Sequence, residues 1–141
     1  MADLSVVDRY PLTPLQQGML FHHLDGTNVG VDIEQLVADL PEPIDAALLE
    51  EAWRRVAAQH PVMRSRYRWV GLDSPVTEIV DTVEVPLIVR DIRGLDPVAQ
   101  QAAFEEFLEE DRRSGFELDA APLWRLNMFS LADEHQRFIF T

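Results

Sequence analysis

The stretch LWRLNMFSLADEHQRFIFT, residues 123–141, contains two apolar segments separated by a polar tetrad. Residues 123–131 and residues 136–141 each have the length and composition of a β-strand. The tetrad Ala-Asp-Glu-His at 132–135 predicts a turn, so the two segments are expected to form an antiparallel hairpin. Residues 138–140, Phe-Ile-Phe, make the second strand apolar on both faces, which is typical of a strand in the middle of a large sheet.

This strand is followed by a single residue, Thr141. A domain is not expected to stop inside its most buried strand, because the exposed backbone groups and apolar side chains would pair with another copy. The sequence therefore predicts that residues 1–141 form one incomplete domain. It also predicts self-association through the terminal strand.

Three helices are expected upstream of the hairpin. Each has a capping residue at its start, followed in two cases by a proline at the first helical position. The second must end before proline, because the residue that precedes a proline avoids helical geometry. They begin at Thr13-Pro14, Asp45 and Asp96-Pro97, and end near Asp25-Gly26, by His60 and at Gly115.

Further strands are expected at residues 30–40, 62–70, 76–80 and 85–89. In the segment 62–70, alternation places Met63, Tyr67 and Trp69 on one face. It places Arg64, Arg66 and Arg68 on the other, which would normally face solvent. The order of elements predicts an α/β protein, a mixed sheet with helices packed against it.

Composition excludes several classes of protein. The chain carries 25 acidic and 12 basic residues, a net charge of −13, so nucleic acid and anionic membrane surfaces are not expected as partners. It has no cysteine, which excludes disulfides and a thiolate nucleophile. The start of the sequence has no signal-peptide pattern, and no apolar run approaches the ~20 residues of a membrane helix. We expect a soluble, cytoplasmic protein.

The residues by themselves indicate no catalytic constellation. The four histidines, His22, His23, His60 and His135, show no metal-binding spacing, so no metal site is expected. No phosphate loop, dinucleotide fingerprint or nucleophile elbow is present. The acidic runs at 50–51, 105–106 and 109–111 are interpreted as solvated helix faces.

Three segments do resemble a known family. The segment YPLTPLQQGMLFHHL, residues 10–24, is similar to the first motif of condensation domains of nonribosomal peptide synthetases. The segment HPVMRSRY, residues 60–67, resembles the second motif. The segment DRRSGFELDAAPLWRLNMFSL, residues 111–131, resembles a later link in which Glu117 stands where the family usually has aspartate. The segments follow the family's order and span most of the chain.

The resemblance implies a fold like chloramphenicol acetyltransferase, with two lobes in a V and a tunnel for phosphopantetheine arms. This chain would be most of the N-terminal lobe. In the family, the strand matching RFIFT leads into an HHxxxDG motif whose second histidine is associated with condensation. None of the histidines here holds that position, so no catalytic residue is assigned, and the 141-residue chain is predicted to be inactive alone.

One functional residue of the family is transferable. Arg64 matches the arginine thought to pair with the aspartate of HHxxxDG, an architectural role. This implied role conflicts with the alternation above, which directs Arg64 toward solvent. No cofactor is expected to bind directly, since the family's substrates are carried on phosphopantetheine.

The implied partners are peptidyl carrier proteins and adjacent synthetase domains. An alternative from another class is a non-catalytic docking module for carrier proteins or for another synthetase subunit. A third is an epimerisation or cyclisation domain of the same superfamily, although the segment 10–24 fits the condensation type better. The amino acids joined, the donor stereochemistry and the peptide product cannot be predicted from this sequence.

Overall fold

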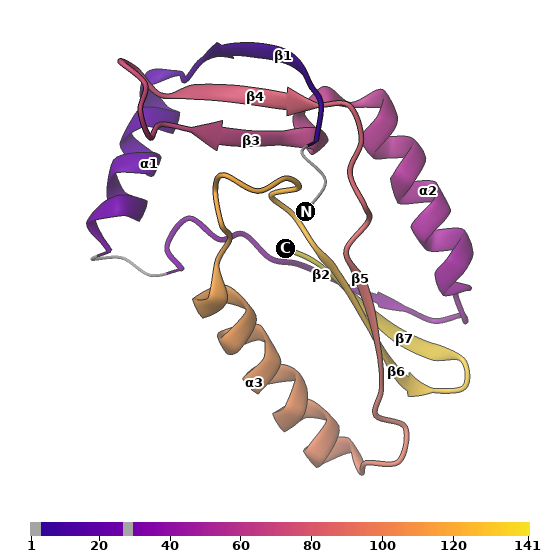
Figure 1. Ribbon diagram of the computed structural model, residues 1–141. Helices are drawn as coiled ribbons and strands as arrows, with labels where there is room; N and C mark the ends of the chain where they lie inside the picture. The colour runs from indigo at the N-terminus through magenta and orange to yellow at the C-terminus, as the bar shows by residue number, and fades with distance from the viewer. Residues whose placement is uncertain (1–3, 27–29) are drawn as a thin grey trace.

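The computed structural model describes residues 4–26 and 30–141 (Figure 1). Within these residues the chain forms strands and helices in an interleaved order. They are β1 Val6–Pro11, α1 Pro14–Asp25, β2 Leu36–Leu40, α2 Ala46–Gln59, a short 3₁₀ helix Pro61–Arg64, β3 Ser65–Arg68, β4 Val76–Val80, β5 Leu87–Asp91, α3 Pro97–Ser114, β6 Leu126–Ala132 and β7 His135–Phe140. No helix in the described ranges is both long and apolar enough to cross a membrane.

The strands belong to two sheets. The smaller is antiparallel, with the order β1-β4-β3. The larger has the order β2-β7-β6-β5, in which β5 and β6 are parallel and the other neighbours antiparallel. The predicted mixed α/β class is confirmed, but the expectation of one sheet was wrong. The strand β1, which the sequence did not predict, pairs with β4, and together with β3 they make a separate sheet.

Strand β7 lies inside the larger sheet. Phe140 pairs with Leu36 of β2 on one side and with Leu126 of β6 on the other. The prediction that residues 138–140 occupy the middle of a sheet is confirmed. The prediction of self-association assumed that the terminal strand is an exposed edge. This assumption was wrong, because the backbone of β7 is paired on both sides. The edge strands of this sheet are β2 and β5.

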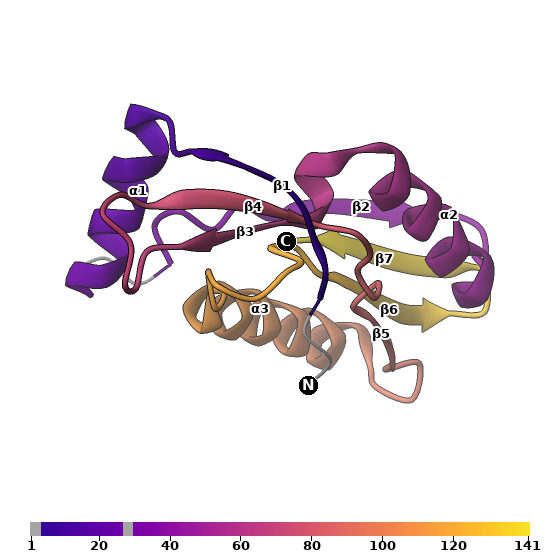
Figure 2. The ribbon, with the colours of Figure 1, turned by 45° about the horizontal axis from the view of Figure 1, so that its top comes forward.

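Helices α2 and α3 cover opposite faces of the larger sheet (Figure 2). On the α2 face, Ala57 packs in a cluster with Trp124 and Leu126. On the α3 face, the buried cluster consists of Phe104, Phe129 and Ile139. The larger sheet is therefore the middle layer of a helix–sheet–helix arrangement, as apolar strands require.

All three predicted helices are present, because their starts are fixed by local capping bonds. Asp45 and Asp96 each accept hydrogen bonds from two backbone amides of the first turn of their helix. Gly26 ends α1 in the left-handed conformation, at φ 67°. His60 and Gly115 end α2 and α3 at the predicted places.

Three of the predicted strands have different bounds in the structure. The strand expected at 30–40 is confined to Leu36–Leu40, and residues 27–29 lie outside the described residues. The strand expected at 62–70 begins only at Ser65, because the preceding residues form the 3₁₀ helix after Pro61. Strand β4 has the predicted bounds, and β5 lies two residues further along the chain than expected.

The cap of α1 gives a first testable prediction. Thr13 accepts a hydrogen bond from the Gln16 amide, 3.3 Å, while its own amide donates to the Gln16 side chain, 2.9 Å. Replacing Thr13 by Ala removes one half of this reciprocal pair and is expected to lower the free energy of unfolding by about 1 kcal/mol in urea titrations. Thr13→Ser keeps the hydroxyl and is the control. Equal stability of T13A and wild type would contradict the assignment.

Candidate functional site

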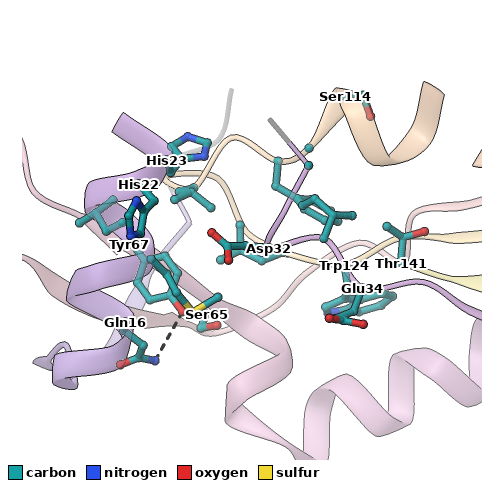
Figure 3. Close-up of a pocket in the computed structure, with 18 of the residues that line it drawn as sticks. Gln16, His22, His23, Asp32, Glu34, Ser65, Tyr67, Ser114, Trp124 and Thr141 are labelled. Atoms are coloured by element: carbon teal, nitrogen blue, oxygen red, sulfur yellow. Dashed lines mark hydrogen bonds between the residues drawn. The ribbon is translucent and has the colours of Figure 1, made fainter. Parts of the chain in front are cut away.

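A cavity of about 530 Å³ opens beside the end of β7. Its walls come from α1, the segment that leads into β2, the segment around β3, the link that follows α3, and the last residues of the chain (Figure 3). The three motif segments, residues 10–24, 60–67 and 111–131, meet here. The residues that they contribute are Gln16, Met19, Leu20, His22 and His23 from the first, Val62, Met63, Ser65 and Tyr67 from the second, and Arg113, Ser114, Gly115, Phe116, Leu118, Leu123 and Trp124 from the third.

Most of the cavity lining is apolar. Trp124, 4% exposed, is part of the lining and donates a hydrogen bond from Nε1 to the Met63 carbonyl, 2.8 Å. The Gln16 side chain lies 3.5 Å from the Tyr67 hydroxyl, so α1 and β3 meet through a polar contact at the cavity wall. Such a lining suits a ligand that is largely uncharged and extended, with few polar contacts.

Charged and titratable groups lie at the rim. His22 and His23 project from α1, and Asp32 and Glu34 from the segment before β2 (Figure 3). Arg113, near the end of α3, is also part of the lining. Among the described residues, no group of three or more histidine, aspartate or glutamate side chains is placed to hold a metal ion. The rim therefore offers polar contacts from both signs of charge around an apolar interior.

The other two histidines lie away from this cavity. His60 caps the end of α2, where its backbone amide donates to the Val56 carbonyl, 3.0 Å. His135 begins β7 on the exposed side of the hairpin, with Nε2 3.4 Å from the Asp39 carboxylate.

The side chain of Arg64 is partly buried and donates hydrogen bonds to backbone carbonyls. Its Nε donates to the Ala57 carbonyl of α2, 2.9 Å, and its Nη1 donates to the carbonyls of Val80 and Asp81 at the end of β4, the latter at 3.1 Å. The alternation that directed Arg64 toward solvent was wrong, because this residue belongs to the 3₁₀ helix and not to the strand. Arg64 thus joins the end of α2 to the end of β4.

Arg66 was also expected to face solvent, and it does not. Its side chain is 14% exposed and its Nε donates to the buried Glu78 carboxylate, 2.9 Å. Arg9 of β1 contacts the same carboxylate. Burial alone would raise the pKa of Glu78, but the hydrogen bonds from Arg9 and Arg66 hold that pKa below its ordinary value. This ion group ties together the three strands of the smaller sheet.

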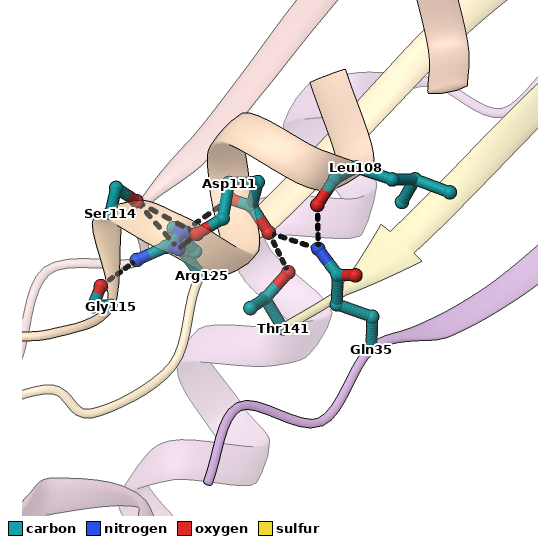
Figure 4. Close-up of polar contacts among 7 residues, drawn as sticks. All are labelled: Gln35, Leu108, Asp111, Ser114, Gly115, Arg125 and Thr141. Atoms are coloured by element: carbon teal, nitrogen blue, oxygen red, sulfur yellow. Dashed lines mark hydrogen bonds and ion pairs between the residues drawn. The ribbon is translucent and has the colours of Figure 1, made fainter. Parts of the chain in front are cut away.

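A second buried carboxylate, Asp111, was interpreted from the sequence as part of a solvated helix face, and this was wrong. Only 7% of Asp111 is exposed, and its carboxylate accepts hydrogen bonds from Arg125 Nε, 2.6 Å, Gln35 Nε2, 2.6 Å, and the Thr141 hydroxyl, 2.7 Å (Figure 4). Burial acts to raise the pKa of Asp111, but the three donors together lower it.

The helical position of Asp111 in the sequence indicates that its side chain is buried. Phe104, Phe107 and Leu108 form the core-facing side of α3, and Asp111 continues that side at the next helical position. A carboxylate on a buried stripe requires partners, and here the partners come from three other segments of the chain.

Comparison with known proteins places this chain in a family. The family model described as "Condensation domain" matches residues 6–141. A linear gramicidin synthase protein from Brevibacillus parabrevis is 37% identical over 139 residues, which cover 99% of this chain and 3% of that protein. Bacitracin synthase 1 from Bacillus licheniformis is 28% identical over 132 residues, which cover 94% of this chain and 2% of that protein.

Solved structures show the same fold. The starter condensation domain of rhizomide synthetase superposes with a TM-score of 0.81 at 19% identity, over 94% of this chain and 33% of that one. The condensation domain of Monacolin K polyketide synthase gives a TM-score of 0.79 at 19% identity, over 96% of this chain and 30% of that one. The fold is that of the N-terminal part of a chloramphenicol-acetyltransferase-like domain.

The chain belongs to the condensation-domain family of nonribosomal peptide synthetases. The resemblance stated from its three motifs is thereby confirmed. The chain spans 3% or less of the two synthases named above and about a third of the solved condensation domains.

Proposed function

We propose that this chain is the N-terminal segment of a condensation domain that forms an amide bond between two carrier-bound aminoacyl or peptidyl thioesters. The observation that carries this proposal is the family match over residues 6–141, together with the convergence of all three motifs on one cavity. In this proposal residues 1–141 are most of the N-terminal lobe, and the HHxxxDG motif and the C-terminal lobe belong to later sequence.

In the proposed reaction, the amine of the downstream aminoacyl thioester attacks the carbonyl of the upstream thioester. A C–N bond forms, the C–S bond breaks, and the proton lost by the amine balances the thiolate released on the upstream carrier. The motif histidine would orient the amine or accept its proton. The segment described here would supply one wall of the space in which the reactants meet, since its cavity adjoins Thr141, the residue before the expected motif.

The partners in this proposal are peptidyl carrier proteins and neighbouring synthetase domains. The substrates would enter on the phosphopantetheine arms of the carriers, and the chain itself would bind no separate cofactor. The apolar lining around Trp124 is compatible with the pantetheine part of such an arm, which is uncharged beyond its phosphate.

The 141-residue chain alone is expected to form no dipeptide. It lacks the motif histidine and the second lobe, so neither the proton-handling group nor the opposite wall would be present. The assay mixes the chain with one donor-loaded and one acceptor-loaded carrier protein and detects the carrier-bound product by mass spectrometry. Dipeptide above the level of a reaction without the chain would contradict this prediction.

The matched control is a complete condensation domain that begins with this sequence. If its coding sequence continues in frame from Thr141 into His-His-x-x-x-Asp-Gly, the complete domain should form dipeptide under the same conditions. A complete domain that carries this motif, binds both carriers and still forms no amide with any aminoacyl pair tested would overturn the proposed function.

A further inference from the structure

The carboxylate of Asp111 lies where four segments of the chain converge. These are the last turn of α3, the entry to β2 at Gln35, the entry to β6 at Arg125 and the end of β7 at Thr141 (Figure 4). The helix and strand ends meet at the rim of the cavity, because Ser114, Gly115 and Thr141 all belong to its lining. The Asp111 group is therefore placed between the layer of α3 and the site.

The contacts of this group form a closed ring through Thr141. Backbone amides and carbonyls of Arg125 and Thr141 bond to each other in both directions, at 3.0 Å each. The Arg125 side chain donates to Asp111, whose other oxygen accepts from the Thr141 hydroxyl. Thr141 is thus held through its backbone by Arg125, the residue before β6, and through its side chain by Asp111 of α3.

Arg125 strengthens the ring at the end of α3. Its Nη1 donates to the Gly115 carbonyl, 2.6 Å, and its guanidinium lies 4.3 Å from the centre of the Phe116 ring. These contacts satisfy carbonyls that the end of a helix leaves without partners. Arg125 therefore contacts both the link that follows α3 and the end of β7, and it fixes their relative positions.

The geometry points to Asp111 and Arg125 as positioning residues that fix the direction in which the chain leaves β7. This inference rests on the proposed function, which places the catalytic motif directly after Thr141. A displacement of about 1 Å at a reacting group can cost roughly a hundredfold in rate, so a strand end fixed by two independent contacts has a direct effect on catalysis. Neither residue touches the reacting atoms; both act through Thr141.

The chain offers a matched control in Glu78. Glu78 and Asp111 are both buried carboxylates, each with a side chain 4% exposed and each paired with arginine. Glu78 lies in the smaller sheet, and its side chain is not part of the cavity lining. Asp111→Asn and Glu78→Gln therefore remove the same kind of interaction at two places, and only one of these places is beside Thr141.

The first readout is hydrogen exchange on the 141-residue chain. Asp111→Asn is expected to accelerate exchange of the Thr141 amide by at least about tenfold, while Glu78→Gln accelerates exchange in β3 and β4 and leaves Thr141 unchanged. Equal effects of the two variants at Thr141 would overturn the positioning role. This readout does not depend on catalysis.

The second readout is dipeptide formation by the complete domain. Asp111→Asn is expected to lower kcat by about tenfold to a hundredfold with little change in KM for the loaded carriers. Glu78→Gln, compared at a temperature where both variants are fully folded, should keep the wild-type kcat. Equal kcat values for the two variants would overturn the inference.

Thr141→Val provides a test that does not disturb the ion pair. It removes only the hydroxyl that donates to Asp111 and should fold normally, with kcat lowered by about threefold and faster exchange at its own amide. If Asp111→Asn fails to fold, this variant decides the question, and an unchanged kcat and exchange rate would overturn the inference. An inactive wild-type domain would instead overturn the proposed function, and with it the catalytic part of this inference.

Discussion

Trp124→Ala is expected to lower the free energy of unfolding by about 3–5 kcal/mol. The side chain is 4% exposed, and its ring lies 5.6 Å from the ring of Trp53 and 6.3 Å from that of Phe140. Alanine would leave a void between α2 and the sheet that these rings cannot fill. Urea titration of the 141-residue chain, followed by circular dichroism, measures the loss.

Two further variants separate the contributions of Trp124. Trp124→Phe keeps an aromatic ring but leaves the Met63 carbonyl without its donor, and should cost about 1–2 kcal/mol. Trp69→Ala is the control for loss of a tryptophan, because Trp69 is half-buried and outside the two core clusters. A loss for Trp124→Ala no larger than that for Trp69→Ala would contradict the structure.

Arg64→Ala is expected to lower the free energy of unfolding by about 2–3 kcal/mol, since hydrogen bonds from a charged donor are lost and their acceptors remain. The three acceptors are backbone carbonyls of Ala57, Val80 and Asp81, so the variant disconnects α2 from β4. The family resemblance gave Arg64 an aspartate partner in the HHxxxDG motif. The contacts seen here are independent of that aspartate, so the effect should appear in the 141-residue chain itself.

Arg68→Ala is the matched control. The Arg68 side chain is 47% exposed and lies 3.9 Å from the Asp119 carboxylate, a surface pair whose loss should change stability by less than about 0.5 kcal/mol. Arg64→Lys should lower the free energy of unfolding by an intermediate amount. The compact lysine ammonium cannot donate to all three carbonyls that the planar guanidinium reaches. Equal stability of R64A and R68A would argue against the bridging role.

The helices could be predicted because their signals are local. The side chains of Thr13, Asp45 and Asp96 bond to amides two or three residues away, so the sequence contains both partners of each cap. Strand β1 could not be found in this way. All its residues are exposed and its pairing partner is β4, so only the distant strand determines its conformation.

The sequence predicted the three motifs of the candidate site but not that they would meet at one cavity. Its three motifs stand out in the sequence, but their convergence on a cavity depends on the sheet order. Arg64 was misplaced because period-two alternation assumes a strand, whereas Pro61 begins a 3₁₀ turn. Asp111 was misread because an acidic run usually faces water, although its helical spacing from Phe104 and Leu108 pointed inward.

The central place of β7 has a consequence for synthesis on the ribosome. Leu36 of β2 pairs with Phe140 of β7, and roughly 100 residues separate the two in sequence. Strand β2 is therefore synthesised about 5–20 s before its partner at ordinary elongation rates. The hairpin partner β6 waits for a much shorter time. During that interval the backbone amides and carbonyls of β2 lack the strand with which they pair in the folded protein. Such long-range closure also predicts slow refolding from denaturant.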